Sequence, residues 1–280
     1  MSKIYITGSG GFIGSHLLKR LPKRNVTCLP HTYCNSVDPL EMLFEQNPPD
    51  YIFHLSSYGN MASQQDEAEM IRANNMALMN LMLASRRYDY KSFINFSSSS
   101  VYGNKKHPMH ETNSLESKTF YGVTKISGEL LVRAFVEKYD KPIVNVRPFS
   151  IYGPGEASFR FIPTVIRCLK KKEPMKLAPG MHDWVFCEDF IDALMLVQEN
   201  VNELKGKAVN IGTGVEYDNY DVFKKLCLIA GILNPNKLPI EHISSLRSQD
   251  SWVADNSLIK SLGWLPAHSL QEGLEKVWNS

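Results

Sequence analysis

The sequence lacks the residue patterns of several protein classes. Its five cysteines, at positions 28, 34, 168, 187 and 227, show neither pairing nor CxxC spacing, and its eight histidines form no HExxH pattern. We therefore expect reduced thiols in a cytoplasmic protein, with no disulfide framework and no metal site. No stretch approaches the roughly 20 apolar residues that cross a bilayer. A strand is already expected from residue 3, which leaves no room for a signal peptide.

An excess of charge is also missing, because the formal net charge is only +2 over 280 residues. Such a balance gives no general field for nucleic acid or an anionic membrane, and neither is expected as a partner. The one dense basic run, Lys170 to Lys172, ends an apolar helical pattern. Positive charge favours that end of a helix dipole, and we interpret the run as a solvated helix end.

Short apolar strands alternate with helical patterns in the first half of the chain. This alternation predicts βαβ crossovers and a parallel sheet, that is, an α/β fold of the Rossmann type with a doubly wound sheet. We assign residues 1–150 to a dinucleotide-binding domain. Strands are expected at 3–7, 25–29, 51–55, 93–97 and 143–147. Helices are expected at 15–21, 64–86 and 119–139, and a further helix is expected to begin with Asp38 as its cap.

The second half is less regular and predicts a smaller, mixed C-terminal domain. We assign residues 151–280 to substrate binding, with segments near 183–215 packing back onto the first domain. A short strand is expected at 208–211. Helices are expected at 161–172, from a cap at Asp189 to residue 198, at 220–231, at 258–262 and at 270–278.

A glycine triplet stands between the first strand and the first helix. Gly8 permits a tight turn, Gly11 lets the backbone approach a pyrophosphate, and Gly14 allows close packing of helix and strand. The N–H groups that open the helix, around Phe12 and Ile13, would then face the phosphates. Because the required strand–turn–helix context is present, the triplet predicts a dinucleotide site rather than a flexible turn.

The end of the second strand bears on which dinucleotide binds. An acidic residue there would hold a ribose 2′-hydroxyl and repel a 2′-phosphate. The chain has no acid before Asp38, and His31 or Thr32 could contact a 2′-phosphate instead. No arginine stands nearby to grip it. We therefore expect NAD(P), with NADP(H) favoured over NAD(H).

Tyr121 and Lys125 are four residues apart and so share one face of the helix expected at 119–139. A phenol with a pKa of about 10 is a poor base at neutral pH. A neighbouring ammonium and a cationic nicotinamide ring would both lower that pKa. Four serines, Ser97 to Ser100, follow the preceding strand and offer a hydroxyl to the same substrate oxygen. A surface pair and a solvated turn are the alternatives, but with the glycine loop upstream we favour catalysis.

Several motifs together resemble the extended short-chain dehydrogenases/reductases, in the NAD-dependent epimerase/dehydratase family that modifies nucleotide-linked sugars. The resemblance covers nearly the whole chain. It implies a hydride-transferring enzyme, without specifying one reaction. The motifs are TGSGGFIG at 7–14, FSSSSVYG at 96–103, YGVTK at 121–125, RPFSIYGPG at 147–155, DWVFCEDF at 183–190, IGTG at 211–214 and LGWLP at 262–266.

The resemblance assigns roles to individual residues. Tyr121 corresponds to the general acid/base and Lys125 to its electrostatic partner, which also holds the nicotinamide ribose. Ser98, three residues before Val101, corresponds to the hydroxyl that orients the sugar oxygen, with Ser99 as the alternative. Further cofactor contacts are implied at Gly8, Gly11, Phe12, Ile13, Gly14, His31, Leu55, Ser56, Ser57, Asn75 and Pro148. Arg147 and Pro148 correspond to the strand end that borders the nicotinamide. Further substrate contacts are implied at Ser150, Arg160 and Arg247, the two arginines near a diphosphate or in surface ion pairs.

The chain also departs from the family pattern. Relatives often have arginine where His182 precedes Asp183, so one phosphate contact is in doubt. They usually carry Gly-Thr where this chain has Leu78 and Met79, which implies altered packing. Asparagine is common where Ser150 stands, and the sugar pocket is therefore expected to be unusual.

The same comparison with the family narrows the reaction. Relatives that dehydrate place an Asp-Glu pair where this chain has Ser99 and Ser100, and those that epimerise beside a ketone need groups such as Cys and His. A 4-ketoreductase or a 4-epimerase needs only Ser, Tyr and Lys. The stretch between the second strand and Tyr51 is short, as in compact nucleotide-sugar reductases, and no acidic residue directly follows that strand. Both features favour the reductase of a nucleotide-linked 4-keto-6-deoxy sugar. A catalytically silent dinucleotide sensor is the alternative of another class, and the long apolar helices suggest a homodimer, as in relatives.

Overall fold

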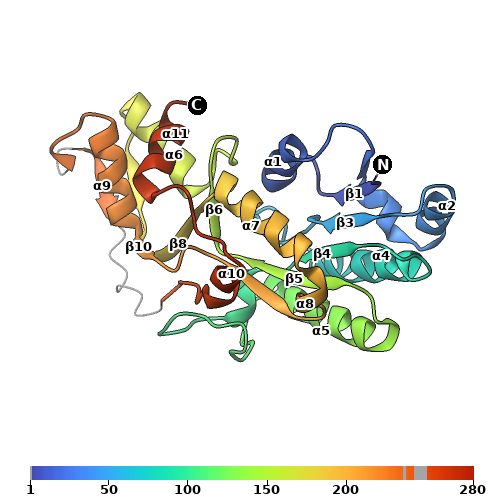
Figure 1. Ribbon diagram of the computed structural model, residues 1–280. Helices are drawn as coiled ribbons and strands as arrows, with labels where there is room; N and C mark the ends of the chain where they lie inside the picture. Colours follow the sequence, from blue (N-terminus) through green and yellow to red (C-terminus); the bar gives the residue numbers. More distant parts are fainter. Residues whose placement is uncertain (1, 236–237, 243–250) are drawn as a thin grey trace.

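The computed structural model describes residues 2–235, 238–242 and 251–280. Its largest element is a six-stranded sheet in the order β2-β1-β3-β4-β5-β9, in which every neighbouring pair is parallel (Figure 1). The expected Rossmann-type architecture is confirmed. The strands are β1 (Ile4–Thr7), β2 (Val26–Leu29), β3 (Tyr51–His54), β4 (Ser92–Phe96), β5 (Ile143–Pro148) and β9 (Ala208–Ile211).

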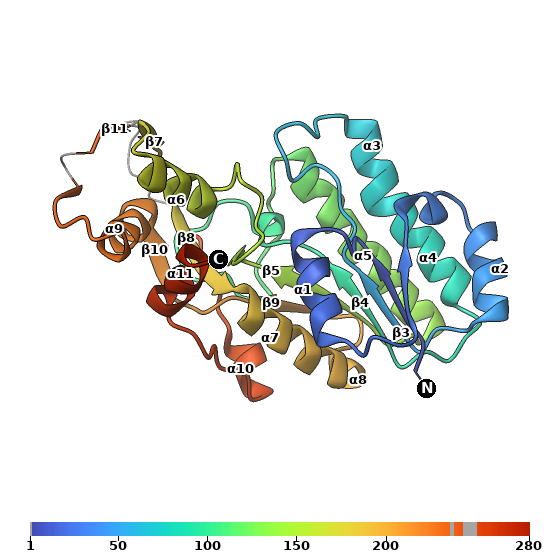
Figure 2. The same cartoon turned by 90° about the horizontal axis from the view of Figure 1, so that it is seen from above.

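Helices cover both faces of this sheet, as Figure 2 shows from above. Alternate strand residues point to opposite faces: Ile4 and Ile6 join the core under one layer, whereas Tyr5 joins the core under the other. The first layer holds α1 (Phe12–Arg20), α7 (Cys187–Glu199) and the short α8 (Val201–Leu204). The second layer holds α2 (Asp38–Gln46), α4 (Ala77–Ser85) and α5 (Phe120–Tyr139).

The helix expected at 64–86 contains an interruption. It begins with α3 (Glu67–Ile71), where the Asp66 side chain accepts from the Glu69 N–H, and it continues into α4 through a π-helical turn at Arg72–Met76. That wide turn carries Asn75, whose side chain donates to the Thr124 carbonyl of α5 at 2.8 Å. The two helices are therefore joined by polar contacts as well as by apolar packing.

Two expected helix caps were wrong. Val37 is the N-cap of α2, so Asp38 is its first residue. The helix α7 begins at Cys187, with the buried Phe186 as its N-cap, and this leaves Asp189 inside its first turn. There the buried Asp189 carboxylate accepts from the His268 N–H at 3.0 Å instead of capping the helix.

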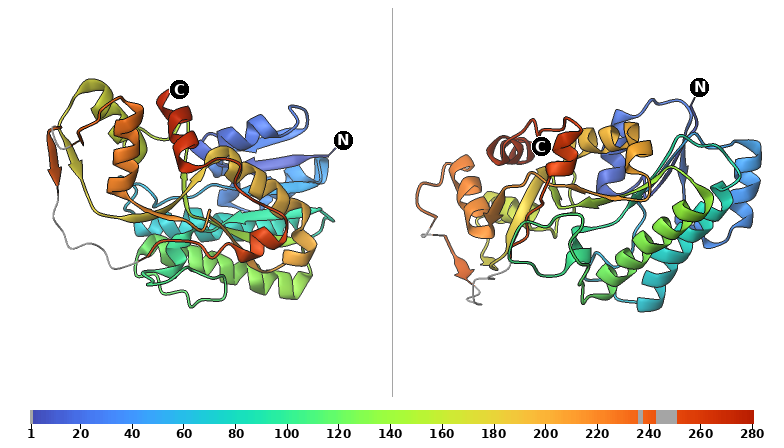
Figure 3. Two further views of the ribbon diagram at one scale, coloured as in Figure 1. Left: turned by 60° about the vertical axis from the view of Figure 1, so that its left-hand side comes forward. Right: turned by 60° about the horizontal axis from the view of Figure 1, so that its bottom comes forward.

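A smaller region with a mixed sheet follows β5 in the chain. Its strands run in the order β10-β8-β6, with β6 parallel and β10 antiparallel to β8. Figure 3 shows helices α6, α9 and α11 gathered around this sheet, and their apolar faces form a separate core with it. The strands are β6 (Ser150–Tyr152), β8 (Met181–Phe186) and β10 (Glu216–Asp218), with a parallel pair formed by β7 (Met175–Leu177) and β11 (Ile240–His242). The helices are α6 (Phe161–Lys171), α9 (Asn219–Ile229), α10 (Ser257–Ser261) and α11 (Leu270–Trp278).

The two regions are not separate in chain order. β9 pairs with β5 and α7 packs over the large sheet, although both follow β8 in the sequence. The domain boundary near residue 150 stays a prediction. Among the residues described, no helix combines the length and apolar character needed to span a membrane.

Gly273 sits where α11 crosses the small sheet. A Cβ there would lie 2.0 Å from the Tyr152 hydroxyl oxygen and 3.0 Å from a ring carbon of Phe186. We expect Gly273→Ala to lower the free energy of unfolding by about 1–3 kcal/mol through overpacking, although alanine alone favours a helix by about 1 kcal/mol. Denaturant unfolding measures the change. The exposed Glu275→Ala is the control, and a Gly273→Ala protein as stable as the control would contradict the packing argument.

Candidate active site

The glycine loop lies at the carboxyl end of β1, where the chain turns into α1. Gly8 has φ near +71°, and a Cβ on it would lie 2.7 Å from the Ser56 nitrogen. A Cβ on Gly14 would lie 2.2 Å from the Gly8 carbonyl oxygen. Gly11 is the N-cap of α1 and donates to that same carbonyl at 3.1 Å. The loop is therefore closed tightly on backbone alone, as a cradle for an anionic group requires.

The position of this loop in the sheet suits a dinucleotide. The chain passes from β1 outward to β2 and then crosses back to β3, so the strand order switches between β1 and β3. Ligands of such sheets bind in the crevice at this switch point. Gly11 brings no side chain, which leaves the first-turn N–H groups of Phe12, Ile13 and Gly14 to face a pyrophosphate. The residues present fit a dinucleotide, which would supply or accept hydride when bound.

The end of β2 is open and uncharged. His31, Thr32 and Tyr33 are exposed in a short 3-10 helix (His31–Asn35), whereas Cys34 is buried. No carboxylate occurs between Leu29 and Asp38. The structure therefore leaves space and donors, but no negative charge, where a dinucleotide's 2′-position is expected.

The segment after β3 is held against β1. The Thr7 hydroxyl and His54 Nδ1 lie 2.8 Å apart, and the Ser56 N–H donates to the Thr7 oxygen at 3.2 Å. Burial, with the Lys125 charge as a second cause, lowers the pKa of His54 to about 3. His54 is therefore neutral at physiological pH, and it positions Leu55, Ser56 and Ser57 along the expected cofactor groove.

The first turn of α5 brings Tyr121 to the end of β4. Thr119 caps the helix by accepting from the Gly122 N–H at 3.1 Å. A Cβ on Gly122 would lie 2.9 Å from the Ser100 carbonyl oxygen, so glycine permits the close approach of α5 to the 3-10 helix (Ser99–Tyr102) that follows β4. The Tyr121 hydroxyl then lies near the hydroxyls of Ser98 and Ser57, which oppose the rise in its pKa that burial causes.

Lys125 lies one turn further along α5 and is buried. Its ammonium donates to the Phe96 carbonyl at 2.9 Å and lies 5.8 Å from the centre of the Tyr121 ring. Burial lowers the pKa of Lys125 to about 8, and the Glu129 carboxylate opposes that change. Burial raises the pKa of Tyr121, against opposing contributions from Ser57, Ser98 and Arg160. The lowering expected beside a cationic nicotinamide ring concerns the complex with the dinucleotide and stays a prediction.

The serine run separates into different environments. Ser98 is the N-cap of a 3-10 helix (Ser99–Tyr102), and its hydroxyl oxygen accepts from the Ser100 N–H at 3.1 Å. The Ser99 hydroxyl oxygen accepts from the Trp252 indole at 3.2 Å. Ser98 therefore lies near Tyr121, whereas Ser99 is bonded to the Trp252 side chain.

The expected substrate side is formed by β6, β8 and the loop before α6. The Ser150 hydroxyl lies 3.2 Å from His182 Nδ1, and burial lowers the His182 pKa. Arg160 is the N-cap of α6 and donates to the Asn60 carbonyl at 3.1 Å, close enough to affect Tyr121. Arg247 lies outside the described residues.

Two acidic residues of this region were missed by the sequence analysis. Burial raises the pKa of Glu156 to about 7, against an opposing effect of Arg160. Glu129 is buried and forms an ion pair with Arg147, whose Nη2 lies 2.6 Å from the carboxylate. The spacing of Glu129 four residues after Lys125 was the available signal. Arg147, which was expected to border the nicotinamide with Pro148, turns its side chain to Glu129.

We expect Gly14→Ala to weaken dinucleotide binding and to lower the free energy of unfolding by about 1–3 kcal/mol, because its Cβ collides with the Gly8 carbonyl. Fluorescence titration with NADPH and denaturant unfolding measure the two effects. Gly10→Ala is the matched control in the same loop, since a Cβ there meets no atom within 4 Å. Equal behaviour of the two variants would count against the close-packed loop.

Comparison with known proteins places this geometry in a family. The model of the NAD dependent epimerase/dehydratase family matches residues 4–212. The chain is 27% identical to a dTDP-glucose 4,6-dehydratase of Salmonella typhimurium and 26% identical to a CDP-abequose synthase of the same organism, covering 98% of this chain in both cases and 91% and 96% of those proteins. The solved structure of MoeE5 in complex with UDP-glucuronic acid and NAD is 28% identical, with a TM-score of 0.85 over 99% of this chain and 98% of that one. The chain is therefore an enzyme and belongs to the NAD-dependent epimerase/dehydratase family.

Proposed function

We propose that the protein is an NAD(P)-dependent oxidoreductase that reduces the 4-keto group of a nucleotide-linked 4-keto-6-deoxy sugar. One observation carries the proposal. Tyr121, Ser98 and Lys125 meet at the carboxyl end of β4, while positions 99 and 100 hold hydroxyls and no carboxylate. This set suffices for hydride transfer at a carbinol carbon and lacks an acid/base pair for the loss of water.

Tyr121, Ser98 and Lys125 each have a separate role in the proposed reduction. The Tyr121 hydroxyl donates a proton to the oxygen at C4 as hydride reaches the carbon, and the Ser98 hydroxyl donates a hydrogen bond to the same oxygen. The Lys125 ammonium stabilises the phenolate that remains. Since burial raises the Tyr121 pKa, the phenol is protonated at neutral pH and is ready to act as an acid. The bound dinucleotide supplies the hydride.

Residues 99 and 100 argue against dehydration. The Ser99 hydroxyl is bonded to Trp252, and the Ser100 backbone is bonded to Ser98. A serine hydroxyl at either position is neither a usable acid nor a usable base at neutral pH. The 27% identity to a 4,6-dehydratase therefore does not carry over the dehydration reaction, because positions 99 and 100 supply neither an acid nor a base.

A 4-epimerase is the second candidate, because it needs the same three residues. The likeness to MoeE5 with bound UDP-glucuronic acid and NAD favours it, as does 28% identity, over 97% of this chain, to a Bacillus subtilis protein named as an uncharacterized UDP-glucose epimerase. The open, uncharged end of β2 at His31 and Thr32 favours reduction with NADPH, because an epimerase returns its hydride to the same molecule and has no need of a 2′-phosphate.

The nucleotide-sugar is expected to lie between the carboxyl ends of β4 and β5 and the small sheet. Ser150 and His182 present a hydroxyl and a neutral imidazole to the sugar or its diphosphate. Arg160 lies near Tyr121 and would contact the diphosphate after leaving the Asn60 carbonyl. Arg247 remains the second arginine proposed for this contact.

Turnover separates the candidates. We expect purified protein with NADPH and a nucleotide-linked 4-keto-6-deoxy sugar to consume the dinucleotide in proportion to the sugar reduced, measured by loss of NADPH absorbance. Formation of a 4-epimer with no net consumption, from protein that retains NAD through purification, would identify an epimerase. Dinucleotide binding with neither reaction would identify a sensor and contradict the proposal.

The Tyr121→Phe variant tests the proton donor. We expect kcat to fall by about 10²–10⁴-fold, the usual contribution of a positioned acid, while NADPH affinity stays close to that of the unmodified protein. Tyr139→Phe, at the other end of the same helix, is the control and should retain full activity. A Tyr121→Phe protein with normal kcat would remove this residue from the chemistry.

We also propose a homodimer that pairs the outer faces of α3 and α5. Phe120, Val123 and Leu130 follow helical spacing on α5 and are 58%, 48% and 48% exposed. Ile71 and Met76 are 49% and 53% exposed on the adjoining α3 and its π turn. Light scattering should give a dimer that Leu130→Glu converts to a monomer, whereas Leu228→Glu, on the exposed face of α9, should leave the dimer intact. A monomeric starting protein would refute the interface.

A further inference from the structure

Glu129 joins the ends of β4 and β5 beneath the proposed catalytic residues. Its side chain is buried, with the residue only 6% exposed. The Arg147 Nε donates to Glu129 Oε1 at 2.8 Å and the Arg147 Nη2 donates to Oε2 at 2.6 Å, while the Ser97 hydroxyl donates to Oε1. Ser97 lies between Phe96, whose carbonyl accepts from Lys125, and Ser98. The Glu129 carboxylate is thus bonded to the segment that carries Ser98 and that accepts the Lys125 hydrogen bond.

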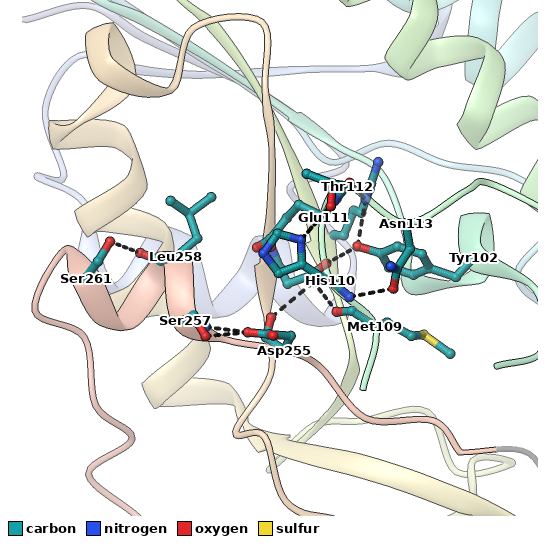
Figure 4. A network of polar contacts seen from close by, with 12 residues as sticks. Tyr102, Met109, His110, Glu111, Thr112, Asn113, Asp255, Ser257, Leu258 and Ser261 are labelled. Atoms are coloured by element: carbon teal, nitrogen blue, oxygen red, sulfur yellow. Dashed lines mark hydrogen bonds and ion pairs between the residues drawn. The ribbon is translucent and has the colours of Figure 1, made fainter. Parts of the chain in front are cut away.

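The guanidinium on the far side of the pair has its own fixed partners. Arg147 Nη1 donates to the Tyr102 hydroxyl at 2.6 Å and to the Glu111 carbonyl at 3.1 Å. Tyr102 in turn donates to Asn210 of β9 at 2.7 Å. Figure 4 shows the surrounding network, in which Tyr102 lies beside the segment from Met109 to Asn113 and this segment reaches Asp255. Every contact is directional, so the Glu129 carboxylate has one orientation.

Stability alone does not explain the buried ion pair of Arg147 and Glu129. Buried ion pairs lose the hydration of both charges, and apolar residues of similar size often serve a fold equally well. The Tyr102 and Ser97 hydroxyls and the Glu111 carbonyl are all bonded to the Arg147–Glu129 pair. A role for the negative charge itself would explain this arrangement, and the nearest functional cation is Lys125.

Among the residues that the structure describes, Glu129 is the carboxylate that acts on Lys125. Glu129 lies one turn along α5, on the same face as Lys125, and favours the ammonium form. From β3, His54 is buried and neutral at physiological pH, as its low pKa shows. Tyr121, on the other side along α5, is protonated because burial raises its pKa. The Arg147 charge on β5 lies behind the carboxylate, which it orients through two hydrogen bonds.

We propose that Glu129 is a positioning residue for catalysis: its carboxylate, oriented by Arg147 and Ser97, keeps Lys125 charged and directed at the dinucleotide and at Tyr121. Glu129 acts through Lys125 and touches no reacting atom. The inference rests on the proposed function in one respect, namely that Lys125 contacts the bound dinucleotide. It does not depend on which sugar is the substrate or on reduction rather than epimerisation.

The pH dependence of NADPH binding tests this role without any sugar. Affinity measured by fluorescence should decline with rising pH as Lys125 loses its proton. Glu129→Gln removes a negative charge, lowers the Lys125 pKa and should move that decline to lower pH by on the order of one unit. Arg147→Met removes a positive charge behind the carboxylate and should move the decline to higher pH. A purely structural role predicts weaker binding in both variants with no opposite displacement, and that result would overturn the proposal.

A double variant keeps the test decisive if a single variant fails to fold. Glu129→Gln combined with Arg147→Met leaves neither member of the ion pair as an unpaired charge. The pH at which binding declines should still lie below that of the unmodified protein, because Glu129 is the charge that acts on the Lys125 pKa. An unchanged decline in a folded double variant would refute the role. Glu111→Gln is the control. This buried carboxylate lies on the other side of Arg147 and accepts from the Asn210 N–H at 2.9 Å, and its loss should not change the pH at which NADPH binding declines. If turnover fails while these displacements occur, only the proposed reaction is wrong.

Discussion

The close contact between α5 and the carboxyl end of β4 is the constraint on which the site depends. Three residues at four-residue intervals along the helix, Tyr121, Lys125 and Glu129, each meet this strand end, at the Ser98 hydroxyl, the Phe96 carbonyl and the Ser97 hydroxyl. Gly122 makes the contact possible, since any larger residue would meet the Ser100 carbonyl. A proton donor, its cation and the counter-charge are therefore aligned by one helix face and one strand end.

Much of this arrangement follows from periodicity and from the glycines. Alternating apolar strands and long helices predict a parallel sheet, whose carboxyl ends must meet at one edge. Gly8, Gly11 and Gly14 mark the dinucleotide loop because their spacing has a steric cause, visible in the short distances that a Cβ would create. The four-residue spacing of Tyr121 and Lys125 likewise predicts a shared helix face. Local rules suffice where the chemistry depends on residues near one another in the chain.

The parts that escaped prediction depend on contacts between distant segments. Asp189 has the sequence context of a helix cap, but α7 starts earlier, at Cys187, and His268, 79 residues away, becomes its partner. Arg147 stands at a strand end like a cofactor contact, yet its guanidinium is bonded to Glu129 of α5. The π turn at Arg72–Met76 also depends on another element, because its Asn75 bonds to α5. No local propensity contains this information.

The site divides into a part with buried charges and a part with uncharged side chains, which explains how one scaffold can serve several reactions. Near Tyr121, the buried charges of Lys125, Glu129 and Arg147 are hydrogen-bonded, and replacing one of them would leave an unpaired buried charge. In the uncharged part, the hydroxyls at positions 99 and 100 and the imidazole of His182 are single side chains whose replacement would disturb no ion pair. Changes in reaction or sugar are therefore least costly at these positions. The residues for hydride transfer, Tyr121 and Lys125 with Glu129 and Arg147, can stay constant while acids, bases or anion contacts are added or lost at positions 99, 100 and 182.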